Sequence, residues 1–453
     1  MPTWIDNLLP HRALLQGDRR LFHLFIGRVL SSTGFSVTLP FLSLYLHDTR
    51  GIPMTAIGGM FFLSALAGAS AQLFGGEWAD RYGRKSILVI AQAGRSVVFL
   101  AMGAAALFHA GFGVFVVLSC VSAFFGRLYE PPSGAMIADI TVGDQRKEAF
   151  GILRIGSNVG FAVGPAIGGF LAALSYATLF FCSALILVVS ALLLAFRIRE
   201  SLPRDRRRGH EAGIGDDLPP RAARKYVRDR LRHGLDIESI LATLRDHRFL
   251  RHSLACLLFF TVMGQLMATF SVFAVDWAGL SKLQLGWIYS LNGTMVTLLQ
   301  FPVVRFLSPY RMTTSLIAGS VILSGGYVMM GFVGGMGPLA VAMAIVTIGE
   351  IIATPAAMNL SASFATEETR GRYMGVHGLF SSFGWSLGPL IGGILLDGAH
   401  GVAWIPWSVI GLLGAFAALG FLDLRRRLSP AMDRGDDPDA PHTVRATATG
   451  GSP

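Results

Sequence analysis

Twelve apolar segments, each long enough to cross a lipid bilayer, are the feature that most constrains the fold of this 453-residue chain. They lie at approximately 22–46, 55–78, 86–108, 112–138, 148–173, 176–197, 251–275, 283–306, 313–335, 338–364, 371–396 and 402–423. Each can span about 30 Å of hydrocarbon as a helix, and none shows the polar–apolar alternation of a barrel strand. Charged residues make up only 15% of the chain, against roughly a quarter in soluble domains. We therefore expect an all-α integral membrane protein with twelve transmembrane helices, and we exclude a soluble enzyme and a secreted disulfide scaffold.

The basic residues are distributed unevenly between the two sides of these segments. Four of the 38 Lys and Arg residues lie well inside predicted helices, away from the helix ends: Arg28, Arg95, Arg127 and Arg154. Two, Arg50 and Lys282, fall in odd-numbered loops, and the other 32 lie in the tails or in or beside even-numbered loops. Because basic residues collect on the cytoplasmic side, we expect a multi-pass protein of the inner (plasma) membrane with both termini in the cytoplasm. This placement explains the net charge of +10 without a nucleic-acid partner.

The chain divides into two halves of six segments. The predicted parts are an N-terminal tail, a first six-helix bundle, a basic linker, a second six-helix bundle and a C-terminal tail, at 1–21, 22–197, 198–250, 251–424 and 425–453. The linker carries 13 basic residues and is either a plain cytoplasmic tether or a segment that meets anionic lipid headgroups. The C-terminal tail has few large apolar residues and is predicted to be disordered. The polar N-terminus has no cleavage signature, so the first apolar segment is expected to remain as a membrane helix.

The residues supply no motif for catalysis or metal binding. Cys120, Cys182 and Cys256 lie in apolar segments, too widely spaced for a zinc-ligand set or a disulfide framework. They are predicted to be small core residues. The sequence shows neither a glycine-rich phosphate-binding loop nor a Ser/His or Cys/His catalytic constellation. We therefore expect no enzyme activity, no cofactor and no bound metal, and the proton is the natural coupling ion because an ATP site is missing.

An internal repeat relates the two halves at an offset of 224 residues. The first half contributes Pro131, Arg146, Gly151, Gly160, Gly164, Pro165, Gly168 and Gly169, which match Pro355, Arg370, Gly375, Gly384, Gly388, Pro389, Gly392 and Gly393. Small residues let helices approach closely in lipid, and Gly-Pro creates a bend, so these residues are predicted to serve helix packing or pivoting. Two parallel halves predict a pseudo-two-fold axis along the membrane normal, with a central site between them and alternating access by rocking.

The loop after the second segment carries a distinctive run, GEWADRYGRK, at 76–85. This run looks like the signature of the major facilitator superfamily, which the chain resembles over nearly its whole length. The resemblance implies a cytoplasmic gate, for which the candidate residues are Gly76, Asp80, Arg81, Gly83, Arg84 and Asp139. Gly76 permits close helix contact and Asp80 can cap a helix N-terminus. Arg84 is expected to pair with Asp139, unless the basic residues are only topology determinants.

Two further stretches resemble the drug:proton efflux branch of this superfamily. The glycine run from Gly151 to Gly169 resembles its antiporter signature, and 349–355 is similar to a stretch in bacterial multidrug exporters. The resemblance implies proton-coupled efflux of lipophilic, cationic small molecules, with membrane lipids as surroundings and a monomer as the family default. Transport of a specific metabolite, such as a sugar or an organic anion, is the first alternative. A membrane sensor that does not transport is the second.

Glu350 is the most informative ionisable residue within a predicted span. Burial favours the neutral form of a carboxyl group, so Glu350 could take up and release a proton or attract a cationic substrate. The alternative is a hydrogen-bonded structural carboxyl. The second half has no Lys or Arg well inside a predicted helix that could neutralise Glu350.

The first half holds several charged candidates for substrate binding or proton coupling. Arg127 and Glu130 are three residues apart, so on one helix they share a face and form either a structural pair or a protonation switch. The resemblance implies a proton-coupling Arg in the fourth helix, for which Arg127 is the best match. Arg28 could snorkel to the cytoplasm, and Arg95 needs a carboxylate, either Glu77 or Glu130.

Three other titratable residues complete the candidates. His377 is either a proton relay or a hydrogen-bonded structural residue. Asp276 and Asp397 lie near the outer ends of their helices and are expected to be solvated.

Overall fold

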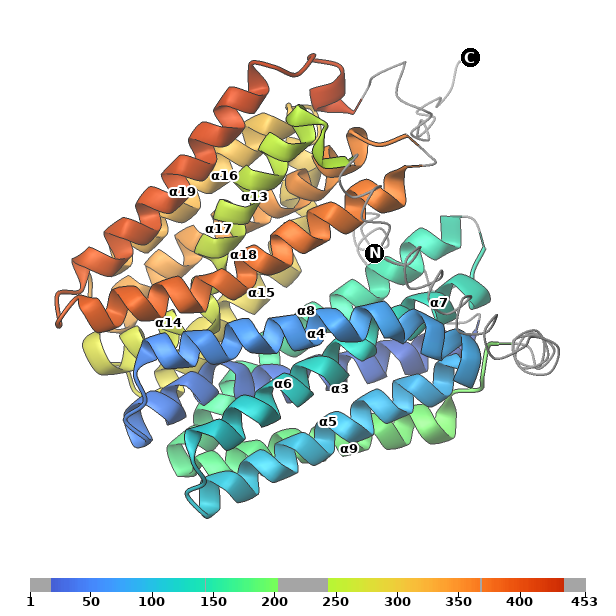
Figure 1. Ribbon diagram of the computed structural model, residues 1–453, viewed down its shortest axis with the longest axis vertical. Helices are drawn as coiled ribbons and strands as arrows, with labels where there is room; N and C mark the ends of the chain where they lie inside the picture. Colours follow the sequence, from blue (N-terminus) through green and yellow to red (C-terminus); the bar gives the residue numbers. More distant parts are fainter. Residues whose placement is uncertain (1–17, 143, 203–242, 367–368, 436–453) are drawn as a thin grey trace, which may run out of the picture.

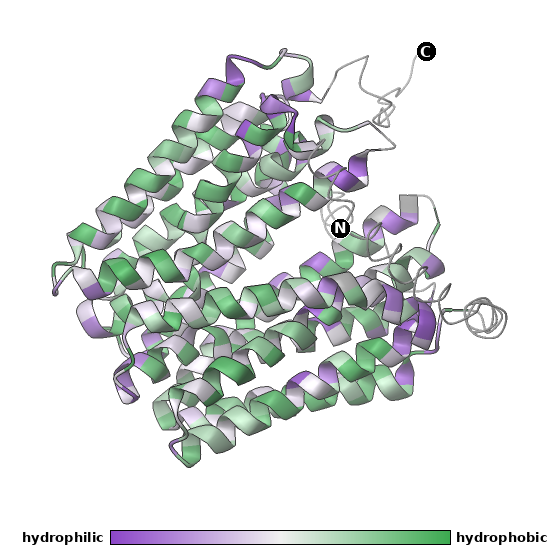
Figure 2. Cartoon of the chain, viewed as in Figure 1, coloured by the Kyte–Doolittle hydropathy of each residue, from purple (hydrophilic) through white to green (hydrophobic). Residues whose placement is uncertain are grey.

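The structure is a computed structural model that describes residues 18–142, 144–202, 243–366 and 369–435. All regular secondary structure in these ranges is helical, and the long helices form two bundles (Figure 1). Three parts of the predicted segments fall outside the described residues: 1–17 of the N-terminal tail, 203–242 of the linker, and 436–453 of the tail at 425–453 that is predicted to be disordered. Hydrophobic residues run along the helices, and hydrophilic ones gather mainly near the helix ends (Figure 2).

Each bundle contains six membrane-crossing units, one of which is broken. The first bundle consists of α3 (Arg19–Leu44), α4 (Met54–Tyr82), α5 (Arg84–Leu107), α6 (Phe112–Leu128), α7 (Glu130–Ile140), α8 (Asp144–Leu174) and α9 (Tyr176–Arg197). The second consists of α13 (His247–Met263), α14 (Thr269–Val272), α15 (Lys282–Leu307), α16 (Met312–Met330), α17 (Met336–Ser363), α18 (Arg370–Gly398) and α19 (Trp404–Arg425). Short π turns, η1 (Tyr45–Thr49) and η3 (Phe273–Trp277), extend α3 and α14. A 3-10 turn, η2 (Gly264–Met267), separates α13 from α14.

Twelve spans are predicted, and eleven helical stretches in the described residues are long and apolar enough to cross a membrane. The remaining unit, α15, has 26 residues but contains Gln284, Asn292 and Gln300, which lower its hydropathy. It begins with a capping box in which Ser281 and Gln284 satisfy each other's backbone N–H groups. The fold is thus the predicted all-α membrane architecture, with one crossing helix more polar than the others.

The break in the fourth crossing unit follows directly from two prolines. Pro131 and Pro132 have no N–H group to donate to the carbonyls of Arg127 and Leu128, four residues earlier. The helix is therefore interrupted at Tyr129, between α6 and α7.

The repeated glycines pack the same helices in both halves. Added Cβ atoms at Gly160, Gly164 and Gly168 would strike α3, the first helix of their own bundle. The equivalent atoms at Gly384, Gly388 and Gly392 would strike α13, η2 and α14, which are the first elements of the second bundle. These glycines therefore allow α8 and α18 to lie directly against those elements.

The last glycine and the proline of each run instead meet the opposite bundle. Gly169 lies against the backbone of α15, and Gly393 lies against the backbone at Met54 and Thr55 at the start of α4. The carbonyls of Pro165 and Pro389 approach Gly286 of α15 and Gly58 of α4 in the same way. The repeat thus specifies two equivalent contacts between the bundles, α8 with α15 and α4 with α18.

The bundles meet at the end opposite the start of α3 and the end of α19, which we call the closed end (Figure 1). Here Asp397 of α18 accepts hydrogen bonds from the backbone N–H groups of Met54 and Thr55, at 3.0 and 2.8 Å. His47 Nε2 lies 3.7 Å from Asp276 Oδ2 of the other bundle. Asp397 is exposed, as expected, and its carboxylate also caps the N–H groups at the start of α4.

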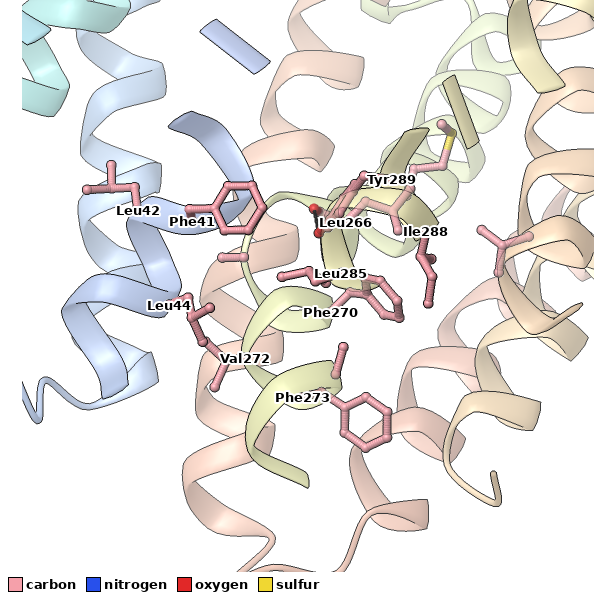
Figure 3. Close-up of a cluster of buried hydrophobic side chains, with 14 of the residues drawn as sticks. Phe41, Leu42, Leu44, Leu266, Phe270, Val272, Phe273, Leu285, Ile288 and Tyr289 are labelled. Carbon is pink, nitrogen blue, oxygen red and sulfur yellow. Dashed lines mark hydrogen bonds between the residues drawn. The ribbon is translucent and has the colours of Figure 1, made fainter. Parts of the chain in front are cut away.

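Apolar side chains fill the interface at the closed end. Phe41 and Leu44 of α3 face Leu266, Phe270 and Val272 of the second bundle (Figure 3), and all five belong to one buried cluster. These apolar contacts exclude water from the interface between the bundles at the closed end.

The bundles diverge at the other end (Figure 1). This end carries the start of α3 and the end of α19, and we call it the terminal end. Nothing lies within 4 Å of a Cβ atom placed on Gly151 of α8, or on Gly375 or Gly378 of α18. Glycines toward the closed end of the same helices touch the opposite bundle. The conformation is therefore closed at one end and open at the terminal end.

A residue that follows each bundle caps that bundle's third crossing helix. Asp433, fully buried in the turn η4 (Met432–Arg434), accepts from Thr313 N at 2.9 Å and from Thr313 Oγ1 at 2.5 Å, at the start of α16. Glu200 accepts from the N–H groups of Arg84 and Lys85 at the start of α5, both at 3.1 Å. A carboxylate stabilises the positive end of a helix dipole, so these contacts fix where both helices begin.

Replacing Asp433 by alanine is expected to lower the free energy of unfolding by about 1–2 kcal/mol, because a buried helix cap is lost. The measurement is the apparent unfolding temperature of the detergent-solubilised protein. Asp423→Ala is the matched control. Its carboxylate pairs with Arg251 and Arg427 but is exposed, so its loss should change stability little. Equal effects of the two substitutions would contradict the capping role.

Candidate functional site

Glu350 lies in α17, partly buried, and its hydrogen-bond partner is neutral. Asn292 Nδ2 of α15 donates to Glu350 Oε2 at 3.2 Å and to Thr347 Oγ1 at 2.9 Å. Among the described residues no cation forms an ion pair with Glu350, and Arg154 of α8, in the opposite bundle, is the positive charge that acts on it. An acid held by an amide, without an ion-pair partner, can gain or lose a proton without breaking a salt bridge.

Glu130 of α7 is paired with a different arginine from the one predicted. Its Oε1 lies 2.6 Å from Arg28 Nη1 of α3, and Arg28 Nε also donates to Ser157 of α8. The expected pair with Arg127 is wrong. The break at Tyr129 places Arg127 and Glu130 in different helices, α6 and α7, so that the spacing of a continuous helix no longer applies.

Arg95 of α5 is buried without the carboxylate that was expected. Its guanidinium carbon lies 4.2 Å from the centroid of the Phe35 ring and 5.9 Å from that of Phe99. Its Nε donates to Ser122 Oγ at 3.4 Å. Neither Glu77 nor Glu130 forms an ion pair with it, so the prediction of a carboxylate partner is wrong. The aromatic faces supply part of the stabilisation that a carboxylate would give.

A double-mutant cycle separates the two possible partners of Glu130. Arg28→Ala and Glu130→Ala are expected to show a coupling free energy of about 1 kcal/mol in thermal unfolding, since their side chains touch. The parallel cycle with Arg127→Ala should give a much smaller value. A larger coupling with Arg127 than with Arg28 would restore the pairing inferred from spacing.

His377 is buried between α13 and α18. Its ring stacks on His252 of α13, with centroids 5.8 Å apart and planes at 14°. Its Nε2 lies 3.4 Å from Ser381 Oγ, one turn along α18. The structure thus surrounds His377 with residues of its own bundle and shows no contact with Glu350.

The predicted gate residues gather at the terminal end of the first bundle. Arg84 of α5 forms an ion pair with Asp139 of α7, as the sequence predicts, and its Nη2 lies 3.9 Å from Asp80 Oδ1 of α4. Arg84 also donates to the carbonyl of Ala135 at 2.6 Å. Gly83 joins α4 to α5 with φ of +94°, a conformation that favours glycine. The cluster thus ties α4, α5 and α7 together within one bundle.

Other parts of the gate differ from expectation. A Cβ atom on Gly76 would meet nothing within 4 Å, whereas one on Gly75 would lie 3.2 Å from Pro131 Cγ, so the close contact belongs to the neighbouring residue. Arg81, a predicted gate residue, lies over the ring of Tyr82, 5.3 Å from its centroid. Glu200 caps α5. Glu200 follows the last helix of the bundle and is far along the chain from the start of α5, so no local sequence pattern identifies it as the cap.

The molecule has two pseudo-symmetric helical bundles that meet at one end, and titratable groups lie along their interface. This arrangement is that of a membrane transport protein. Residues 24–365 and 278–447 match the Major Facilitator Superfamily. The chain therefore belongs to this superfamily and is a transporter, not an enzyme.

Relatives and solved structures agree with this assignment. The multidrug resistance protein MdtH of Cronobacter sakazakii is 28% identical over 417 residues, which cover 91% of this chain and 96% of that protein. A POT family transporter solved in complex with 5-aminolevulinic acid superposes with a TM-score of 0.72 at 13% identity, covering 90% of this chain and 96% of its own. A bacterial homologue of the human lysosomal transporter Spinster, solved in an inward-facing conformation, gives a TM-score of 0.69 at 18% identity, with coverage of 91% and 98%. The solved structures support the fold.

Proposed function

We propose that this transporter exports lipophilic, cationic small molecules from the cytoplasm in exchange for protons. The observation that carries the proposal is the environment of Glu350. Its carboxyl is partly buried, its hydrogen-bond partner is the neutral Asn292, and the positive charge that acts on it, Arg154, belongs to the other bundle. Such a carboxyl can hold either a proton or a cationic group, but not both, which is the requirement for exchange. The multidrug resistance name of the relatives points in the same direction.

The conformation supplies one half of an alternating-access cycle. We place the terminal end in the cytoplasm of a cell with the protein in its inner membrane, because the basic residues gather there. The structure is then inward-facing, and a cytoplasmic substrate reaches Glu350 between the diverging ends. Rocking about the α4–α18 and α8–α15 contacts would close the terminal end and open the closed end. A proton from outside would then displace the substrate from Glu350.

Asp80, Arg84 and Asp139 are proposed to stabilise the contact between the two bundles when the terminal end closes. In the present state Asp80, Arg84 and Asp139 interact within the first bundle. The end of α4 and the start of α18 lie at the same end of the molecule, so closure would bring Asp80 toward the N–H groups that begin α18. The closed end shows the reciprocal contact, Asp397 on the start of α4.

Transport of a metabolite with an anionic group is the second candidate, and the first bundle favours it. Arg95 is buried and Arg127 forms no ion pair among the described residues, while Arg28 is balanced by Glu130. This half therefore presents more positive than negative charge. An anionic group would be attracted here, just as a cationic group would be attracted to Glu350.

Proteoliposomes of the full chain distinguish these functions. With an acidic lumen, proton-coupled exchange should drive a cationic dye such as ethidium inward and make the lumen alkaline, as reported by a trapped pH indicator. An organic anion that moves in its place would favour the second candidate. If neither solute moves in a folded preparation that still binds them, the proposed export function fails.

A further inference from the structure

Three metal-ligating side chains meet inside the second bundle, away from the contacts used above. His252 and Cys256 are four residues apart on α13 and share a face, and His377 of α18 faces them. One ligand atom from each of the three residues lies within 4.8 Å of the others. Their exposed fractions are 0%, 0% and 4%. The cluster joins residues more than a hundred positions apart, which is why sequence spacing does not reveal it.

In both histidines the contacts with oxygen atoms involve Nε2 and leave Nδ1 without an oxygen partner. His252 Nε2 lies 3.2 Å from the carbonyl oxygen of Ala357 and 2.8 Å from Ser361 Oγ. His377 Nε2 lies 3.4 Å from Ser381 Oγ, and its buried Nδ1 has no hydrogen-bond partner. A ligating histidine commonly donates its other N–H to a carbonyl or a similar oxygen, which orients the ring. In both rings Nε2 faces an oxygen, so Nδ1 is the atom left to bind an ion.

The spacing of the free atoms suits one small metal ion. Cys256 Sγ lies 3.9 Å from His252 Nδ1 and 3.5 Å from His252 Nε2. A sulfur and a nitrogen bound to the same ion at about 2.3 and 2.0 Å, at trigonal angles, are about 3.7 Å apart. A movement of the side chains by a few tenths of an ångström brings the Sγ and Nδ1 atoms to ligand distance. His377, whose Nδ1 is buried without a hydrogen-bond partner, is the candidate for the third ligand.

The ligand set and its surroundings select a monovalent soft ion. One thiolate and two neutral imidazoles carry a single negative charge, and the cluster includes no carboxylate. Cu(I) would leave the site neutral, whereas Zn(II) would leave a net positive charge inside a membrane-spanning bundle, which is costly. Thiolate ligands favour Cu(I), and structural zinc sites almost always use four protein ligands.

We propose that His252 Nδ1, Cys256 Sγ and His377 Nδ1 form a three-coordinate Cu(I) site that links α13 to α18. Binding replaces the thiol proton of Cys256 with the ion and releases that proton, without any change of oxidation state. The ion would hold α18, which contacts the opposite bundle, against α13, the first helix of the second bundle. The site is independent of the direction and substrate of transport.

The test is anaerobic titration of the detergent-solubilised full chain with Cu(I) in competition with bicinchoninate. The wild type is expected to bind one equivalent, and Cys256→Ser should lose it. A Cys120→Ser/Cys182→Ser double variant is the matched control and should keep it, because those cysteines lie in the first bundle. His377→Gln should weaken binding by about tenfold or more. Full binding by Cys256→Ser, or no binding by the wild type, overturns the proposal.

X-ray absorption of copper in the Cys120→Ser/Cys182→Ser variant provides a measurement that does not depend on the folding of Cys256→Ser. The expected spectrum shows one sulfur and two imidazole nitrogens around three-coordinate Cu(I). Copper bound without sulfur, or without imidazole, rejects the site. Binding of silver ions detected by mass spectrometry is not a sufficient test, because it reports how much ion is bound and does not identify the ligand atoms.

Discussion

Replacing Glu350 by glutamine is expected to reduce proton-driven efflux at least about tenfold, to the level of liposomes without protein. Glutamine has the same shape and can still accept the hydrogen bond from Asn292, so α15 and α17 should remain together. It cannot exchange a proton or carry a negative charge, so both functions proposed for the carboxyl are lost. The measurement is the initial rate of dye movement in proteoliposomes with an imposed pH gradient, together with the proton flux that accompanies it.

Asp423→Asn provides the matched control for this experiment. It makes the same acid-to-amide change at an exposed carboxylate on α19, where Arg251 and Arg427 are its partners, and transport should continue at the wild-type rate. Retained proton-driven efflux in Glu350→Gln would remove Glu350 as the proton carrier. Dye movement that persists without proton flux would instead show that Glu350 couples transport but does not bind the dye.

The architecture could be predicted from the sequence because lipid leaves the backbone few alternatives. An apolar segment of about 20 residues must satisfy its backbone hydrogen bonds internally, so its hydropathy specifies a helix. The glycine repeat was equally informative. A glycine in a membrane helix allows a neighbouring backbone to approach, and the structure places Gly164 and Gly388 against the first elements of their bundles. The family signature similarly identified the pairing of Arg84 with Asp139.

The partners of the charged residues could not be predicted in the same way. Spacing identifies neighbours along one continuous helix, and Pro131 interrupts the helix between Arg127 and Glu130. Arg28 of α3 then supplies the partner of Glu130, which depends on how three helices pack. For Arg95, the sequence indicated only the need for compensation, and the structure provides aromatic rings where a carboxylate was expected.

The sequence also gave little warning of caps and clusters formed across long distances. Asp397, Glu200 and Asp433 each cap a helix that begins more than a hundred residues away along the chain. His252 and Cys256 are four residues apart, which is a detectable signal, but the third member, His377, becomes adjacent only when α18 packs on α13. Such contacts follow from tertiary packing and not from local pattern.

Placing a methyl group on Gly393 is expected to be the most damaging small change in the glycine repeat. In Gly393→Ala the new Cβ would lie 2.6 Å from the carbonyl carbon of Met54 and 2.9 Å from the N atom of Thr55. Both are backbone atoms, so only separation of α18 from α4 can relieve the overlap, which would also lengthen the hydrogen bonds from this part of α4 to Asp397. Overpacking of this kind costs about 1–3 kcal/mol, so the closed-end contact should become roughly 5 to 150 times less populated.

Gly325→Ala, in the middle of α16, is the matched control, because nothing lies within 4 Å of its added Cβ and alanine favours the helix by about 1 kcal/mol. It should transport normally and unfold no earlier than the wild type. Gly393→Ala should lose most of its transport rate and show longer distances between spin labels placed at the closed ends of the two bundles. Equal transport by the two variants, with unchanged distances, would mean that the α4–α18 contact is not needed for the conformation that is open at the terminal end. The proposed rocking about these glycines would then be wrong.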